Sequence, residues 1–250
     1  MKEMKKLMAK LTWPEVGEYL KENDSILFPT GSTEQHGKHI AEDNDAFTAF
    51  EIAKRVAERT GVLVAPPMPF GNSIHHMGFP GTITLTFDTL VDVYKEVCES
   101  LIKHGFKKVV IMNGHGGNTN AIAQALREVR EETGVIVYSV MVFPGKFGAE
   151  STKILEQKTG GHACEEETSI GLYLGQRVLM ERAEDWKPPK TWTEFNAKYR
   201  QKVEMAMNWN ELTDIGSIGE PTLATSEKGK RMVEVVVEDM SSFIEDLKKL

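Results

Sequence analysis

Short apolar runs alternate with longer amphipathic stretches along most of the chain. Four runs rich in β-branched and other apolar residues predict buried strands, at residues 25–29, 62–65, 109–112 and 135–140. The stretches between them predict helices, at residues 45–59, 88–104 and 118–133. This alternation indicates an α/β fold with a mostly parallel sheet and helices on both of its faces.

The helical period is clearest in residues 88–104. Five apolar residues of this stretch fall on one helical face: Leu90, Val93, Tyr94, Val97 and Leu101. Gly105 and Gly134 stand where helix C-caps are expected. Two further helices are predicted outside the alternating region, at residues 13–22 and 226–247.

Composition points to one folded domain. The chain has 250 residues, of which 40% are hydrophobic and 27% charged, as is usual for a globular protein. No internal repeat, low-complexity tract or linker interrupts it. We therefore expect residues 1–250 to form a single domain.

Charge and cysteine content exclude several classes of protein. The formal net charge of −7 argues against nucleic-acid binding and against a polybasic membrane surface. The longest nearly apolar run, residues 135–143, is far shorter than the roughly 20 residues of a membrane span. Residues 1–13 carry scattered charges and lack the apolar core of a signal peptide. Cys98 and Cys164 form no disulfide framework, so we expect a soluble, cytoplasmic protein.

Polar loops follow two of the predicted strands. Glu34 and His36 lie in the glycine-containing loop after the first strand, and His115 lies between glycines after the third. Asp45 stands where it would cap the next helix, although such an aspartate is often no more than a cap. In open α/β sheets, sites form at the carboxyl ends of strands, so these side chains are expected to converge.

A third group of polar residues lies later in the chain. His162 is followed by three consecutive glutamates, Glu165 to Glu167, and His162 and Glu165 would share a face if this segment were helical. A run of glutamates is ordinarily a solvated helix face. Together with the two loops, however, it completes a set of imidazoles and carboxylates that suits Zn²⁺, Mn²⁺ or Fe²⁺.

Other catalytic motifs are incomplete. The glycine-rich loop after the third strand has Thr119 where a dinucleotide-binding motif needs its last glycine, and His75 breaks a GxSxG pattern. The sequence holds no Walker loop and no HExxH motif. Cys164 lies beside three carboxylates, which disfavour its thiolate form.

With these motifs in order, the chain resembles the creatininase (creatinine amidohydrolase) family. The matching segments are residues 29–37 (PTGSTEQHG), Asp45, 79–82 (FPGT), 113–118 (NGHGGN), His162 with 167–169 (ETS), 219–221 (GEP) and 227–229 (EKG). The resemblance implies a three-layer α/β/α fold and a site for two divalent metal ions.

The resemblance also implies roles for single residues. Glu34 and His115 resemble ligands of one ion, His36 resembles a ligand of the other, and Asp45 resembles the bridge. Creatininase has a glutamate two residues after the histidine of the NGH motif, but this chain has Gly117 there. Many relatives place a glutamate three residues after the second histidine instead, which predicts Glu165 as the missing ligand.

The implied activity is hydrolysis, in which water activated by the metal ions is added to a carbonyl carbon. His162 is the expected proton donor, and Glu167 is expected to orient His162 or a ligand. The first expectation is cleavage of a C–N amide-type bond in a small, polar, cyclic substrate. Opening of a keto-inositol ring by C–C hydrolysis is the alternative, and a non-catalytic metal-binding protein is the alternative of another class.

Two expectations concern surroundings and assembly. Five polar residues are expected near the pocket and suit a polyhydroxylated molecule: His39, Glu42, Asp43, His75 and His76. The family resemblance implies a homo-oligomer, such as a hexamer. The segment 186–209 is rich in aromatic residues, which predicts either an oligomer contact or packing onto the chain's own core.

Overall fold

Four parallel strands form one sheet in the computed structural model, which describes residues 6–199, 202–203 and 205–250. The strands are β1 (Ser25–Thr30), β2 (Leu63–Val64), β3 (Lys108–Asn113) and β4 (Tyr138–Met141), in the order β2-β1-β3-β4. β1 lies at the centre and pairs over its whole length with β3, from Ser25 opposite Lys108 to Thr30 opposite Asn113.

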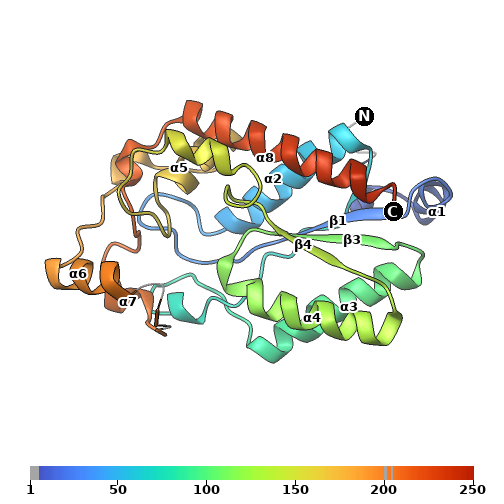
Figure 1. Cartoon of the computed structure of the whole chain (residues 1–250), viewed down its shortest axis with the longest axis horizontal. Helices are drawn as coiled ribbons and strands as arrows, with labels where there is room; N and C mark the ends of the chain where they lie inside the picture. Colours follow the sequence, from blue (N-terminus) through green and yellow to red (C-terminus); the bar gives the residue numbers. More distant parts are fainter. Residues whose placement is uncertain (1–5, 200–201, 204) are drawn as a thin grey trace.

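Helices cover both faces of this sheet, as Figure 1 shows. The α-helices are α1 (Trp13–Leu20), α2 (Asn44–Thr60), α3 (Phe87–Lys103), α4 (Thr119–Thr133), α5 (Glu165–Leu174), α6 (Lys190–Tyr199), α7 (Trp209–Leu212) and α8 (Ser226–Leu247). Short 3₁₀ helices are η2 (Met8–Lys10), η3 (Ile74–His76), η4 (Gly116–Asn118), η5 (Ala149–Ile154), η6 (Met180–Arg182) and η7 (Pro221–Leu223). The three-layer α/β/α architecture predicted from the sequence is confirmed.

Each face of the sheet has its own hydrophobic core, because successive strand residues point to opposite sides. Leu27 of β1 packs in one core with residues of α2, α5 and α8. Its neighbours Ile26 and Phe28 pack in the other core with residues of α3 and α4. Since β1 is buried throughout, it appears in the sequence as a continuous apolar run.

The strand order reverses between β1 and β3. From β1 the chain passes through α2 to β2 on one side, and then through α3 to β3 on the other side of β1. The loops after β1 and β3 therefore diverge above the same edge of the sheet. In this class of fold, that reversal point is where ligands bind.

Most predicted elements agree with the structure to within one or two residues. The largest difference among the strands concerns the run at 135–140. β4 begins only at Tyr138, where pairing with Val110 of β3 starts, and Ile136 is 52% exposed. Residues 135–137 are rich in β-branched residues, but composition does not predict at which residue β4 starts to pair with β3. None of the described helices has the length and apolar character needed to span a membrane.

Candidate metal centre and its cavity

Four of the predicted site residues converge at the carboxyl ends of β1 and β3. Glu34 and His36 come from the loop after β1, Asp45 from the first turn of α2, and His115 from the loop after β3. All four side chains are buried. Ligand atoms of Glu34, Asp45 and His115 lie within 4.8 Å of one another, close enough to hold one ion.

Asp45 lies between the two imidazoles. Its Oδ1 is 3.0 Å from Nε2 of His36, and its Oδ2 is 3.0 Å from Nδ1 of His115. Oδ2 also accepts a hydrogen bond of 2.9 Å from the Ser32 hydroxyl. One carboxylate thus faces both imidazoles, as a bridging ligand must.

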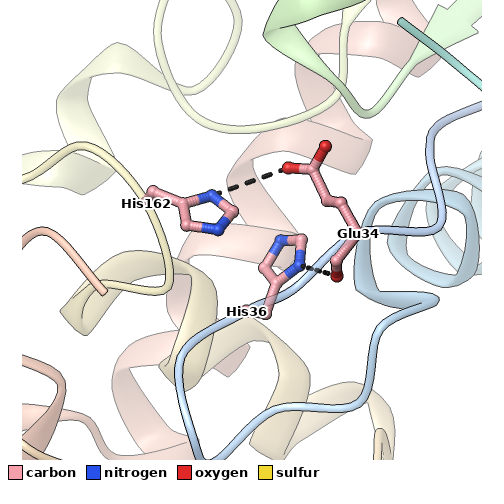
Figure 2. Close-up of side chains that lie close together, drawn as sticks. All are labelled: Glu34, His36 and His162. Carbon is pink, nitrogen blue, oxygen red and sulfur yellow. Dashed lines mark hydrogen bonds and ion pairs between the residues drawn. The ribbon is translucent and has the colours of Figure 1, made fainter. Parts of the chain in front are cut away.

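Backbone carbonyls set the orientation of the histidines. Nδ1–H of His36 donates to the Glu34 carbonyl at 3.0 Å, and Nε2–H of His115 donates to the Asn72 carbonyl at 3.0 Å. His162 is held in the same way, because its Nε2–H donates to the Gln35 carbonyl at 2.6 Å. The second nitrogen of each ring is therefore turned toward the carboxylates. Figure 2 shows His162 directed at the Glu34 carboxylate and His36 held by the Glu34 carbonyl.

The buried groups shift one another's pKa values. Burial acts to lower the pKa of His36 and of His115, but the carboxylates around them outweigh it and raise the values to about 10 and about 9. Burial and the Asp45 charge raise the pKa of Glu34. Although burial acts to raise the pKa of Asp45, His36 and His115 hold it below its ordinary value. The carboxylates therefore favour a positive charge in their midst, here the protonated form of the two imidazoles.

Glu167 supplies the third carboxylate of the cluster. It lies in the first turn of α5, and its ligand atom is within 4.8 Å of those of His36 and Asp45. Burial raises the pKa of Glu167 to about 7. At Gly117, where creatininase has its glutamate, an added Cβ would lie 2.3 Å from the Asn72 carbonyl oxygen. This backbone leaves no room for a side chain at that position.

The structure corrects the expectation that Glu165 completes the second metal site. Glu165 is fully buried, but it neither lines the cavity nor belongs to a group of described residues close enough to share an ion. One of its oxygens accepts hydrogen bonds from the backbone amides of Glu156 and Gln157, and the other pairs with Lys228. Helix α5 begins at Glu165, so Glu165 and Glu167 leave the helix in different directions.

His162 lies outside the helix, which corrects the expected shared face with Glu165. Ala163 has a φ of 47° and turns the chain just before α5 begins. The backbone of His162 pairs with Ile218 instead, through hydrogen bonds of 3.1 and 2.8 Å. This turn directs Nδ1 of His162 toward Glu34, at 3.7 Å from Oε1. Burial, together with His36 and His76, lowers the pKa of His162 well below its ordinary value.

A cavity of about 370 Å³ opens beside the cluster. It is lined by Glu34, Asp45, His75, His76, Gly114, His115, Gly116, Gly117, Met141, Phe143, Gly161, His162, Glu166, Glu167 and Trp209. No lysine or arginine stands among these lining residues. The cavity is therefore rich in carboxylates and imidazoles and has no permanent side-chain cation.

Several lining residues, among them His76, Glu166 and Trp209, were not assigned to the metal site or to catalysis from the sequence. Nε2 of His76 lies 3.4 Å from Glu34, and the ring of Trp209 lies 4.7 Å from that of His76. Glu166 borders the cavity, and burial and Glu167 raise its pKa to about 8. His76 stands just before the FPGT motif, a position that already marked it as near the pocket. Nothing local marked Trp209, which comes from α7.

Three of the five polar residues expected near the pocket do not line it. His39 is buried and bonds to Thr168 at 3.0 Å, while Asp43 accepts a hydrogen bond from Gln176. Glu42 is likewise outside the lining. Of that set, His75 and His76 line the cavity.

Comparison with known proteins identifies the family. The creatininase profile, described as "Creatinine amidohydrolase", matches residues 9–244. The chain therefore belongs to the creatininase family. Because the members of this family that it matches are hydrolases, it is a hydrolase.

Its relatives differ in what they act on. The mycofactocin precursor peptide peptidase of Mycobacterium ulcerans is 31% identical and aligns over 93% of this chain and 85% of its own length. The 3-dehydro-scyllo-inosose hydrolase of Thermotoga maritima is 28% identical over 95% of this chain and 82% of that protein. The creatinine amidohydrolase of Pseudomonas putida is 28% identical over 96% of both chains.

Solved creatininases share the fold. One creatinine amidohydrolase structure superposes with a TM-score of 0.85 at 26% identity, covering 97% of this chain and 98% of the other. Two further solved creatininases, described as of Zn-Zn type and as creatininase Mn, give TM-scores of 0.83 and 0.82. Family membership alone leaves the substrate open, because the relatives named above act on different substrates.

Proposed function

We propose that the cavity holds two divalent cations. Glu34 and His115 would bind the first, His36 and Glu167 the second, and Asp45 both. The observation that carries this proposal is the convergence of three carboxylates in a cavity whose lining offers no lysine or arginine. Buried charges are normally paired or bound to metal.

The donor set fits such ions. Oε2 of Glu34 is buried and makes no hydrogen bond among the described residues, and it lies 3.3 Å from Nδ1 of His115, the other proposed ligand of the first ion. The carbonyls that hold His36 and His115 leave one nitrogen of each ring for the metal. Imidazole and carboxylate oxygen are ligands of Zn²⁺ and Mn²⁺. Since protons compete for the same atoms, we expect binding to weaken as the pH falls.

The reaction we propose is hydrolysis of a C–N bond next to a carbonyl in a small polar substrate. Two divalent ions held by these residues would supply water of lowered pKa and would polarise the carbonyl. The amides of Gly116 and Gly117 border the cavity and would support the developing oxyanion. The remaining task, the transfer of a proton to the leaving group, falls to a side chain of the cavity.

His162 would transfer the proton. The Gln35 carbonyl holds its Nε2–H, and its lowered pKa keeps the ring neutral, so Nδ1 presents a lone pair to the cavity. Nδ1 would take a proton from the attacking water and give it to the leaving nitrogen as the C–N bond breaks. Glu167 is assigned to the second cation rather than to orienting His162, because its carboxylate reaches His36 and Asp45.

The cavity favours a small molecule. A volume of about 370 Å³ lies near the lower end of the range for small-molecule sites, roughly 300–1,000 Å³. Its lining is mostly imidazole, carboxylate and backbone, with Trp209 as the largest apolar surface. A cyclic amide or urea has the size and polarity for this space.

Ring opening of a keto-inositol is the second candidate. His75, His76 and Glu166 offer several hydrogen-bonding groups on the cavity wall, as a substrate with many hydroxyls requires. The similarity to the 3-dehydro-scyllo-inosose hydrolase supports the same candidate. Both reactions add water to a carbonyl carbon and need a proton for the leaving group.

Metal analysis combined with a substrate screen tests this proposal. Protein purified with Zn²⁺ or Mn²⁺ is expected to hold about two ions per chain, and chelation should abolish turnover. The screen covers cyclic ureas, lactams, formamides, short peptides and keto-inositols. Glu34→Gln is expected to lose metal and activity, whereas the exposed Glu150→Gln should retain both. Failure of the wild type to bind any ion would overturn the proposal.

A further inference from the structure

Both carboxylate oxygens of Glu165 have hydrogen-bond partners, although this residue does not line the cavity. Its Oε2 accepts hydrogen bonds from the amides of Glu156 at 2.9 Å and Gln157 at 2.7 Å. In return, the Gln157 side chain accepts a hydrogen bond of 3.0 Å from the Glu165 amide. The first residue of α5 is therefore tied to the segment that enters the loop carrying His162.

Lys228 completes this arrangement from the start of α8. Its ammonium group bonds to Oε1 of Glu165 at 2.5 Å, to Glu156 at 2.7 Å and to the Leu223 carbonyl at 2.9 Å. The Lys228 side chain is 16% exposed and that of Glu165 is fully buried, so the pair is shielded from water. One cation thus joins α8, α5 and the loop in front of α5.

The residues held by this pair bracket the site. Between Gln157 and Glu165 the chain forms the loop with His162, and two residues beyond Glu165 stands Glu167. The loop has a second tie to the C-terminal part of the chain, because the Glu220 carboxylate accepts a hydrogen bond of 2.6 Å from the Lys158 amide. A displacement of the loop would move both His162 and Glu167 relative to Glu34 and Asp45.

The sequence motifs EKG (227–229) and GEP (219–221) thereby find a role, although neither lines the cavity. Lys228 supplies the cation, and Glu220 supplies the second anchor. Gly229 lets α8 approach α5 so closely that an added Cβ would lie 1.9 Å from the Ser169 carbonyl oxygen. Both motifs thus contact the segment around this loop without lining the cavity.

We propose that the buried Glu165–Lys228 pair is a positioning device that holds His162 and Glu167 against the cation site. The inference rests on the proposed function for the identity of that site. It assigns to Glu165 and Lys228 no contact with substrate or ion. Groups that orient ligands typically change metal affinity about 10–100-fold when they are removed.

The test uses Lys228→Met, Glu165→Leu and Glu165→Gln in the full chain. Zn²⁺ titration of metal-free protein measures the affinity of each of the two ions. Lys228→Met and Glu165→Leu should weaken the second ion about 10–100-fold and leave the first near wild type, since Glu34, Asp45 and His115 do not depend on this loop. Glu165→Gln keeps an acceptor for the two amides and should lose less. Lys249→Met, which breaks an exposed pair with Asp246, is the matched control and should change neither affinity.

Hydrogen exchange gives a second measurement that needs no ion. In Lys228→Met the amides of Glu156, Gln157 and Ala163 should exchange faster, while those of β1 stay protected. A pair that only stabilises the fold would lower the melting temperature but leave both ion affinities and these amides unchanged, which would overturn the proposal. If the wild type binds no ion, the proposed function fails, and exchange at these amides alone decides whether the pair holds the loop.

Discussion

Three backbone carbonyls, those of Glu34, Gln35 and Asn72, decide which nitrogen of each site histidine faces the carboxylates. This is why the imidazoles of the cluster are oriented before any ligand arrives. Pre-orientation lowers the entropic cost of binding and keeps each ring in one tautomer. The chemistry of the site therefore depends on a few main-chain oxygens as much as on the side chains.

Two variants separate the roles of His162 and Glu167. His162→Asn is expected to keep about two ions per chain while turnover falls by roughly 10²–10⁴, the usual effect of removing a general acid–base. Glu167→Gln is expected to lose the second ion, because its carboxylate lies with His36 and Asp45. Elemental analysis beside steady-state kinetics measures both effects.

The leaving group provides the control for His162. Substrates with good leaving groups need less protonation, so His162→Asn should affect them less than poor ones. If the His162→Asn variant loses an ion, His162 is a metal ligand. The structure permits this role, because a ligand atom of His162 lies within 4.8 Å of those of Glu34 and His36. Full activity with both ions present would remove His162 from the mechanism.

At the scale of elements, the contact between α8 and α5 is unusually close. It packs Gly229 onto the backbone of α5, and the amide of Thr225, which caps α8, donates to the Ser169 hydroxyl at 3.1 Å. Because the nearest atom to an added Cβ at Gly229 is backbone, relief requires one helix to move. The position of α5 and of Glu167 on it thus depends on this glycine.

Gly229→Ala is expected to destabilise the fold by about 1–3 kcal/mol, the usual cost of overpacking. Chemical or thermal unfolding measures the change. Gly17→Ala in α1 is the matched control, because an added Cβ there has no atom within 4 Å. That control should be neutral or stabilising by up to about 1 kcal/mol, since alanine restricts the unfolded chain. Equal stability of the two variants would contradict the close contact.

The sequence predicts the sheet, its flanking helices and the convergence of Glu34, His36, Asp45 and His115, because these depend on local periodicity and on the polar residues that follow the strands. The role of each of the four as a metal ligand came from the family resemblance and stays a prediction. The choice between Glu165 and Glu167 could not be made this way. It depends on the turn at Ala163 and on a pairing with Lys228, 63 residues away, which no local pattern reveals.

At the scale of the whole molecule, the cavity is assembled from segments spread along the chain. The loops after β1 and β3 and the first turns of α2 and α5 supply the cluster, and Trp209 of α7 lines the cavity beside it. Helix α8 returns from the far end of the chain to pack on α2 and α5 (Figure 1). This return is consistent with residues 1–250 forming one domain, which stays a prediction.

The aromatic segment 186–209 divides into two parts in the structure. Trp186 donates a hydrogen bond to the Leu212 carbonyl at 3.2 Å, and Trp209 faces the cavity, so both pack onto their own chain. Phe195 of α6 remains 43% exposed, and Val203 and Met205 nearby are 50% and 44% exposed. Among the described residues of this segment, which leave out 200, 201 and 204, this exposed part is the one that still supports an oligomer contact.

We expect a homo-oligomer in which this exposed part is covered by another copy of the chain. Sedimentation at micromolar concentration should show a species larger than the 28.0 kDa chain. Phe195→Glu should shift it toward the monomer, because a charge buried in an apolar contact is costly. Met77→Glu, at a residue 53% exposed in a different apolar region, is the comparison. Dissociation by Met77→Glu alone would move the interface to that region, and a wild type that sediments only as a monomer would refute the oligomer.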